Sequence, residues 1–87
     1  IKSRREKFSE ALDLPKDLIL NLPRIIFTGN KEVYIEQYRG IVEYGDDFIK
    51  LGAANLMLCI KGQNIEIRSI SGDEIVLGGN IKGFDFI

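Results

Sequence analysis

From Arg24 to the end of the chain, apolar residues alternate with polar ones in short runs, and turn-forming residues separate the runs. Val33 and Ile35 alternate with charged or aromatic neighbours, and Ile65 and Ile67 alternate with polar ones. A period of two is typical of a strand with one buried face. The pattern predicts eight strands, at residues 24–28, 31–37, 40–44, 47–51, 55–61, 64–70, 73–78 and 81–86.

The predicted strands are joined by short turns, such as Gly62-Gln63-Asn64 and Gly78-Gly79-Asn80. Connections this short allow antiparallel hairpins but not parallel crossovers. The predicted fold is therefore mainly β: a short N-terminal helix followed by an antiparallel meander of about seven to eight short strands, forming a small sandwich or barrel. The alternation places six residues in the core: Leu56, Leu58, Ile60, Ile65, Ile67 and Ile75.

The beginning of the chain follows a different pattern. Ser3 and Glu6 fit a capping box ahead of a narrow apolar stripe, so residues 1–14 are predicted to form a helix with a basic first turn. Residues 15–23 contain two prolines and several leucines, and are interpreted as an apolar connector that plugs one end of the core. We expect all 87 residues (1-87) to form a single domain, with the β-meander at 24–87.

Composition limits the chemistry available to the chain. It has 87 residues, of which 45% are hydrophobic, and a formal net charge of -1. It contains no histidine, and Cys59 is its single cysteine, which excludes a histidine-based triad and a zinc site of cysteine and histidine. No catalytic residue, metal site or cofactor is predicted, and the chain is expected not to be an enzyme. Cys59 is expected to be buried, and its apolar run, 56–60, is too short to span a bilayer.

One group of residues has the composition of a binding surface. The group combines aromatic rings with a guanidinium group, as protein interfaces and single-stranded nucleic-acid sites both do. Its members are Tyr34, Tyr38, Arg39, Gly40 and Tyr44. The alternative is that these rings pack across a tight hairpin turning near Arg39 and Gly40. We predict a partner-binding surface at these five residues, and the packing interpretation stays open.

Several short motifs form a further pattern along nearly the whole chain. They are Leu14-Pro15-Lys16-Asp17, Leu22-Pro23-Arg24-Ile25, Gly29-Asn30, Tyr34-Ile35-Glu36, Arg39-Gly40-Ile41, Ile60-Lys61-Gly62-Gln63-Asn64 and Glu74-Ile75. In order and spacing these motifs resemble the YabP/YqfC family of sporulation proteins, and most closely its YqfC branch. One departure is Gln37-Tyr38, which stands where family members often have His or Asn.

This resemblance implies a small non-enzymatic protein, made in the mother cell of endospore-forming bacteria and needed for normal spore development. It implies a protein partner, namely a membrane protein of the sporulation machinery, and a cytoplasmic place beside the membrane around the forespore. The residues themselves add one expectation, a homo-oligomer formed through a sheet edge or an apolar face. The last predicted strand ends Phe84-Asp85-Phe86-Ile87, with little charge to block pairing.

A weaker resemblance is to the Sm-like RNA-binding fold. Residues 33–51 are loosely similar to the first Sm motif, and residues 60–65 to the second, whose basic residue and glycine contact RNA. However, Ile49-Lys50 stands where the uridine-binding pattern should lie, and an isoelectric point near 5.4 gives poor electrostatic support for RNA binding. A single-stranded RNA-binding protein is therefore the alternative function, and nucleic acid is not the expected partner.

Overall fold

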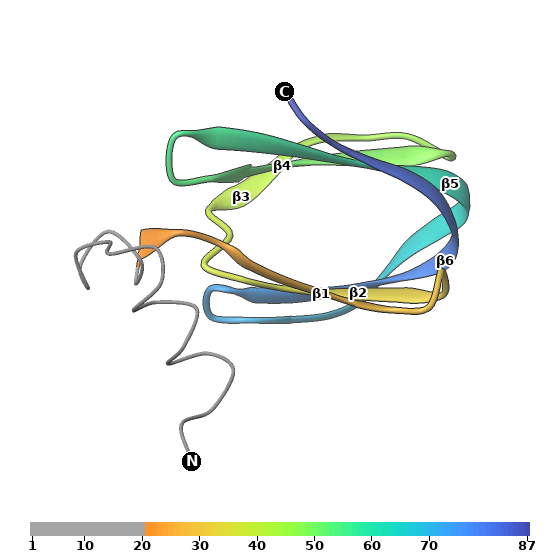
Figure 1. Cartoon of the computed structure of the whole chain (residues 1–87), viewed down its shortest axis with the longest axis horizontal. Coiled ribbons are helices and arrows are strands. Elements are labelled where there is room, and N and C mark those ends of the chain that lie inside the picture. Colours follow the sequence, from red (N-terminus) through yellow and green to blue (C-terminus); the bar gives the residue numbers. More distant parts are fainter. Residues whose placement is uncertain (1–20) are drawn as a thin grey trace, which may run out of the picture.

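The computed structural model describes residues 21–87, which form one antiparallel sheet of six strands (Figure 1). The strands are β1 (Arg24–Thr28), β2 (Glu32–Glu36), β3 (Gly40–Tyr44), β4 (Phe48–Ala53), β5 (Leu56–Ser71) and β6 (Glu74–Phe86). Their order across the sheet is β1-β2-β6-β5-β4-β3. The prediction of a mainly β, antiparallel fold is confirmed.

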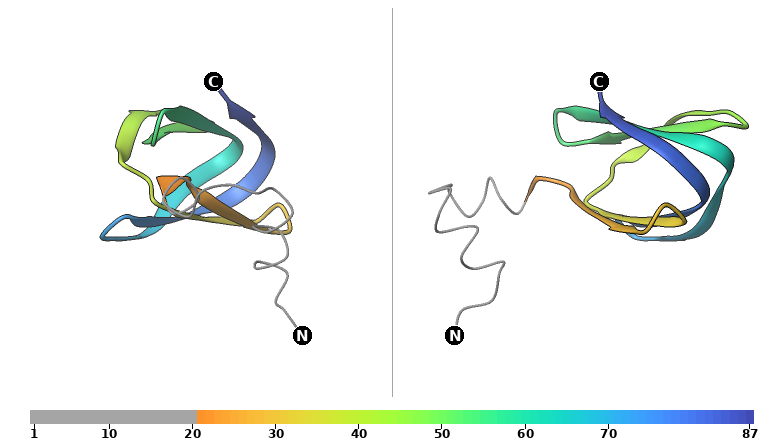
Figure 2. Two further views of the ribbon diagram at one scale, coloured as in Figure 1. Left: turned by 60° about the vertical axis from the view of Figure 1, so that its left-hand side comes forward. Right: turned by 45° about the vertical axis from the view of Figure 1, so that its right-hand side comes forward.

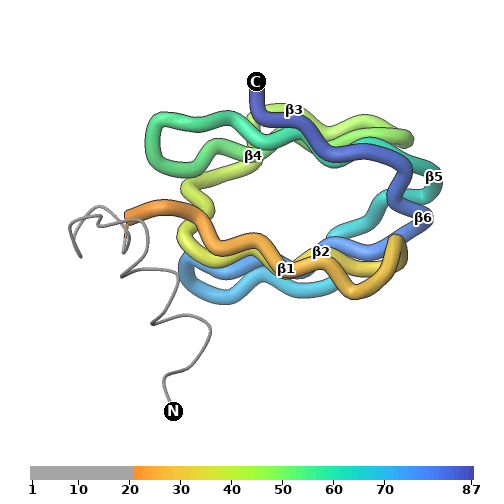
Figure 3. The backbone as a smooth tube through the Cα atoms, in the orientation of Figure 1, coloured from red at the N-terminus to blue at the C-terminus, as the bar shows by residue number. Residues whose placement is uncertain are grey.

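The two longest strands, β5 and β6, bend together, so that the sheet folds over and its two halves face each other (Figures 1 and 2). The first half contains β1, β2, the start of β6 and the end of β5. The second half contains β3, β4, the start of β5 and the end of β6. On the side opposite the bend, the chain between β2 and β3 crosses from one half to the other (Figure 3).

The predicted number of strands is wrong, because two pairs of predicted strands are continuous. The strands predicted at 55–61 and 64–70 join into β5, and those at 73–78 and 81–86 join into β6. The glycine- and asparagine-rich segments between them are irregularities within one ladder, where the register of β5 against β6 shifts. Turns and bulges often use the same residue types, because many of both contain a residue with positive φ, as Asn64 (56°) and Gly79 (139°) have here.

The bend depends on Gly62 and Gly79, at which the backbones of β5 and β6 come close together. A Cβ atom on Gly62 would overlap the backbone carbonyl of Asn80, and one on Gly79 would lie 2.6 Å from the carbonyl oxygen of Asn64. The positive φ of Gly79 is also one that residues with a side chain rarely adopt. Both positions therefore require glycine for the strands to bend as they do.

Hydrogen bonds attach the loop between β1 and β2 to this bend. Asn30 Nδ2 donates to Asn80 Oδ1 at 2.9 Å, and Asn80 Nδ2 donates to Gln63 Oε1 at 3.2 Å. The backbone N–H of Ile81 donates to the carbonyl of Asn30 at 2.7 Å. The amide side chains of three segments far apart in sequence thus hold the hairpin and the bend in one arrangement.

The core lies between the two halves. Of the six residues predicted to be there, four are buried, while Leu56 and Ile67 are partly buried and pack against the others. No polar or charged side chain is buried within residues 21–87. The other members of the core are Val33, Ile35, Ile49, Leu51, Ala53, Leu77 and Ile81.

The strand order differs from the predicted meander. β3 to β6 follow one another, but β2 pairs with β6 and not with β3. Over residues 21–87, β1 and β3 are the edge strands, and no pairing between them closes the sheet into a barrel. The helix predicted at 1–14, and residues 15–20 of the predicted connector, lie outside the described residues.

Ile60→Ala should lower the free energy of unfolding by about 2–5 kcal/mol, because Ile60 is completely buried and the change leaves a cavity. Ile70→Ala is the control: its side chain is 51% exposed, so the loss should be well under about 2 kcal/mol. Denaturant unfolding of both variants measures the difference. Equal losses would mean that the buried and exposed positions of β5 are assigned wrongly.

Gly62→Ala should destabilise the protein by about 1–3 kcal/mol or more, because the new methyl group overlaps backbone that cannot move aside alone. Gly83→Ala provides a matched control on β6, since a Cβ atom there meets nothing within 4 Å. Thermal and denaturant unfolding should leave Gly83→Ala at least as stable as the original protein. A Gly62→Ala protein of unchanged stability would contradict the proposed role of the close approach.

Candidate functional site

The five residues predicted to bind a partner lie at three places in the fold. Tyr34 is on β2, Tyr38 and Arg39 belong to the segment that crosses between the halves, and Gly40 and Tyr44 are the two ends of β3. Arg39 and Tyr44 are exposed, whereas the other three are partly buried. The fold places Tyr34 and Tyr44 in different halves of the sheet, and their role in partner binding stays a prediction.

The hairpin considered near Arg39 and Gly40 does not form, because the chain there crosses from the first half to the second. The N–H of Tyr38 donates to the carbonyl of Asp73 at 3.1 Å, and the N–H of Arg39 donates to the carbonyl of Gly52 at 2.7 Å. These bonds satisfy backbone groups that a hairpin ladder would otherwise have paired. The Tyr38 side chain packs against the core, and the Arg39 side chain remains exposed.

Tyr34 lies on the outer face of the first half, between Ile26 of β1 and Val76 of β6. Burial, together with the nearby carboxylates of Glu74 and Glu36, raises the pKa of Tyr34 to about 12. Its hydroxyl therefore stays protonated at neutral pH and can donate a hydrogen bond.

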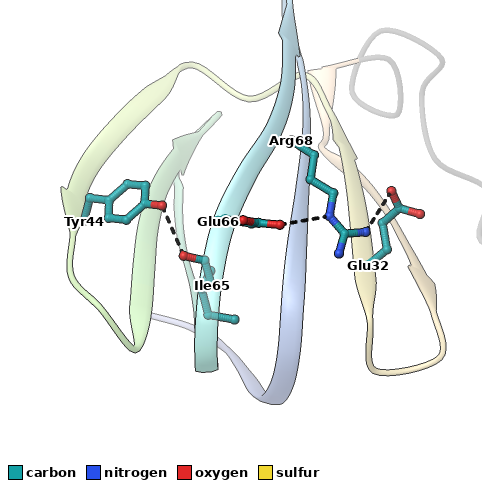
Figure 4. Close-up of polar contacts among 5 residues, drawn as sticks. All are labelled: Glu32, Tyr44, Ile65, Glu66 and Arg68. Carbon is teal, nitrogen blue, oxygen red and sulfur yellow. Dashed lines mark hydrogen bonds and ion pairs between the residues drawn. The ribbon is translucent and has the colours of Figure 1, made fainter.

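Tyr44 joins the edge of the second half to the bend in β5. Its hydroxyl donates to the backbone carbonyl of Ile65 at 3.1 Å, while 48% of the residue remains exposed (Figure 4). A phenol whose oxygen is engaged and whose ring is accessible presents a fixed apolar surface. The bond therefore orients the Tyr44 ring at the edge of the sheet.

Two aliphatic side chains of β3 are exposed as well. Ile41 is 41% exposed and Val42 is 56% exposed. The register against β4 shifts between Ile41 and Glu43, so that Val42 is the extra residue of a bulge. We call Arg39, Ile41, Val42 and Tyr44 the β3 surface.

The sequence prediction missed Ile41 and Val42 as surface residues. Alternation assigns one of two adjacent apolar residues to the core, whereas the bulge leaves both largely exposed. The signal was the adjacent pair itself, because two aliphatic residues in succession break the period of two within a short strand. Sequence alone does not distinguish such a break from a strand buried on both faces.

A shallow depression of about 390 Å³ lies over β4 and β5 on the outer face of the second half. Two of its lysines already have carboxylate partners: Lys61 pairs with Asp85 at 2.6 Å, and Lys50 pairs with Glu43 at 3.3 Å. The hydrogen bond to Asp85 raises the pKa of Lys61. The lining residues are Asp47, Phe48, Lys50, Cys59, Lys61, Gly62 and Lys82. Cys59 is only 3% exposed, which confirms its predicted burial.

Charged side chains elsewhere on the outer surface form long, exposed ion pairs. Arg68 lies between two carboxylates, 3.5 Å from Glu66 and 3.8 Å from Glu32 (Figure 4). Pairs of this kind contribute at most about 1 kcal/mol each. They give the surface its charge pattern and do not form a reactive centre.

The described part of the chain contains no group of three or more cysteine, aspartate or glutamate residues placed to hold a metal ion. Within residues 21–87, no helix has the length and apolar character needed to cross a membrane. The arrangement at the β3 surface offers apolar contact and one guanidinium group. Both kinds of group can take part in contacts with a partner.

Comparison with known proteins agrees with the motifs in the sequence. The YabP family matches residues 21–87, which is the whole of the described part. The chain is also 34% identical over 73 residues to "Uncharacterized protein YqfC" of Bacillus subtilis (strain 168), an alignment that covers 84% of this chain and 78% of that protein. No solved structure matches. Neither similarity supports the Sm-like alternative, and the chain belongs to the YabP/YqfC family.

Proposed function

We propose that the protein is a non-enzymatic interaction module that acts in the mother cell during spore development. The resemblance of its motifs to a family of sporulation proteins supports this setting. The observation that carries the proposal is the β3 surface, where one edge strand has three apolar residues that are each at least 41% exposed and follows an exposed arginine in the chain. Protein interfaces concentrate aromatic residues and arginine in this way.

The β3 surface suits a partner that contacts side chains. The bulge at Val42 interrupts the edge of the sheet, which disfavours the addition of a further strand along β3. Arg39 can stack on an aromatic ring or bind a carboxylate through two parallel hydrogen bonds. The partner on this account presents an apolar patch with an acidic or aromatic residue at its border.

The partner we propose is a membrane protein of the sporulation machinery, which would hold this protein on the cytoplasmic side of the membrane around the forespore. The family resemblance supports this assignment. The basic first turn expected in the sequence near Arg4 and Arg5 adds attraction to an anionic surface. Binding through the β3 surface would leave the core and the bend unchanged.

Arg39→Ala should weaken partner binding by more than about fivefold, as expected for an interface residue worth over about 1 kcal/mol. In an endospore-forming bacterium that depends on this chain, the yield of heat-resistant spores should fall. Stability should change by less than about 0.5 kcal/mol, because the side chain is exposed. Lys82→Ala is the control, since it removes one exposed positive charge from β6, which β5 and β4 separate from β3 in the sheet.

Two results would contradict the proposal for Arg39. Normal spore yield in the Arg39→Ala strain would show that the β3 surface does not serve sporulation through this residue. A large loss of thermal stability in the purified variant would make Arg39 a structural residue of the crossing segment.

Val42→Asp should release the protein from the membrane around the forespore. The side chain is 56% exposed, so the variant should fold, while a carboxylate in an apolar contact would be costly to bury. Fluorescence microscopy of tagged protein in sporulating cells should show a membrane-associated signal that becomes diffuse in the variant. A diffuse signal for the unmodified protein would contradict the proposed location.

A further inference from the structure

β1 is an edge strand whose features favour pairing with another strand. It pairs only with β2 among the described elements, and its register is unbroken from Arg24 to Thr28. It contains no lysine, proline or bulge, which are the features that usually protect an edge. The opposite edge, β3, is protected by the bulge between Ile41 and Glu43.

Apolar surface is exposed on both faces of β1. Ile26 is 39% exposed on the outer face, and Phe27 is 42% exposed on the inner side. The Phe27 ring packs edge-on against Phe84, with ring centroids 5.6 Å apart, and Phe84 packs in the same way against Phe86 at 4.9 Å. Phe86 is itself 61% exposed. A strand added along β1 would cover apolar side chains on both faces, beside this aromatic cluster.

We propose that two copies of this chain associate by antiparallel pairing of β1, with Ile26 of one copy opposite Ile26 of the second copy. In this register Ile25 faces Phe27 of the second copy, and all five residues of the strand have a partner. A shift of this register by one residue would place the inner face of one copy's sheet on the same side as the outer face of the other's. A shift of two residues would leave only three residues paired.

The charges of the first half are compatible with this register. Arg24 is the single charged residue of β1 and pairs with Glu36 of its own chain at 3.2 Å. Across the new pair, Arg24 faces Thr28 of the second copy, which is uncharged. The next strand places Glu32 of the second copy in the same row, roughly 10 Å away between Cα atoms, or two strand spacings. Opposite charges therefore approach, and no like charges face each other.

The resulting assembly is a closed dimer. A two-fold axis relates the β1 strands of the two copies, so each β1 edge is paired in the dimer. No β1 edge remains for a third copy, and the contact does not continue into a filament. The four strands of each first half would join into one continuous sheet across the two copies. The β3 surface lies at the opposite edge and stays free, so this inference does not rest on the proposed function.

Cysteine cross-linking tests the register directly. Residues opposite each other in an antiparallel pair have Cα atoms about 4.5–5.5 Å apart, within the range of a disulfide. Ile26→Cys should therefore give a disulfide-linked dimer under mild oxidation. Val42→Cys, at the exposed position on the other edge, is the matched control and should form little or no disulfide link between copies. The natural Cys59 is buried and should not react in either variant.

Light scattering and analytical ultracentrifugation of the full chain provide the second measurement. At high micromolar concentration the mass should be twice the 9.8 kDa of one chain. Ile26→Lys should raise the dissociation constant by more than about tenfold, because two ammonium groups would face each other across the pair. Val42→Lys should leave it unchanged.

Three outcomes would overturn the inference. The unmodified chain could remain a monomer at every concentration. Val42→Cys could cross-link as readily as Ile26→Cys. Alternatively, Val42→Lys could dissociate the dimer while Ile26→Lys left it intact, which would place the interface on β3. The cross-linking result stands even if Ile26→Lys fails to fold.

Discussion

The close approach of β5 and β6 at Gly62 and Gly79 is the constraint on which the rest of this fold depends. Because neither residue has a side chain, two strands of 16 and 13 residues can bend together without separating. Each strand then contributes to both halves of the sheet. One pair of strands thus builds two facing layers, and the core fills the space between them.

The bend also determines which backbone edges remain open. Since β5 and β6 are each paired on both sides along part of their length, β1 and β3 are left at the ends of the sheet. The two edges differ in their physical properties. The bulge at Val42 turns β3 into a surface of exposed side chains, whereas β1 keeps an unbroken edge. The described part of the chain therefore has two sheet edges of different character.

Stability and specificity come from different groups in this molecule. The buried side chains of residues 21–87 are all apolar, so burial of hydrocarbon supplies the main driving force. The ion pairs are exposed and individually weak. The amides of Asn30, Asn80 and Gln63 instead help to fix a single arrangement of the hairpin against the bend, because each must find a geometrically suitable partner.

The sequence by itself determined the local structure and the family. Alternation identified the β-rich class and placed the first four strands to within about two residues at each end. It also gave the inward direction of residues such as Ile60 and Ile75, because the alternation of side chains is a local property of a strand. The tertiary structure alone decided that Gly62 and Gly79 bend two long strands and do not end four short ones, since the local signal for a turn and for a bulge is the same. It likewise decided that the chain after Glu36 crosses to the other half, that Tyr34 lies apart from Tyr44, and that Ile41 and Val42 are exposed. These outcomes depend on which distant strands pair. The backbone hydrogen bonds involved, such as the one from Tyr38 to Asp73, join residues far apart in sequence.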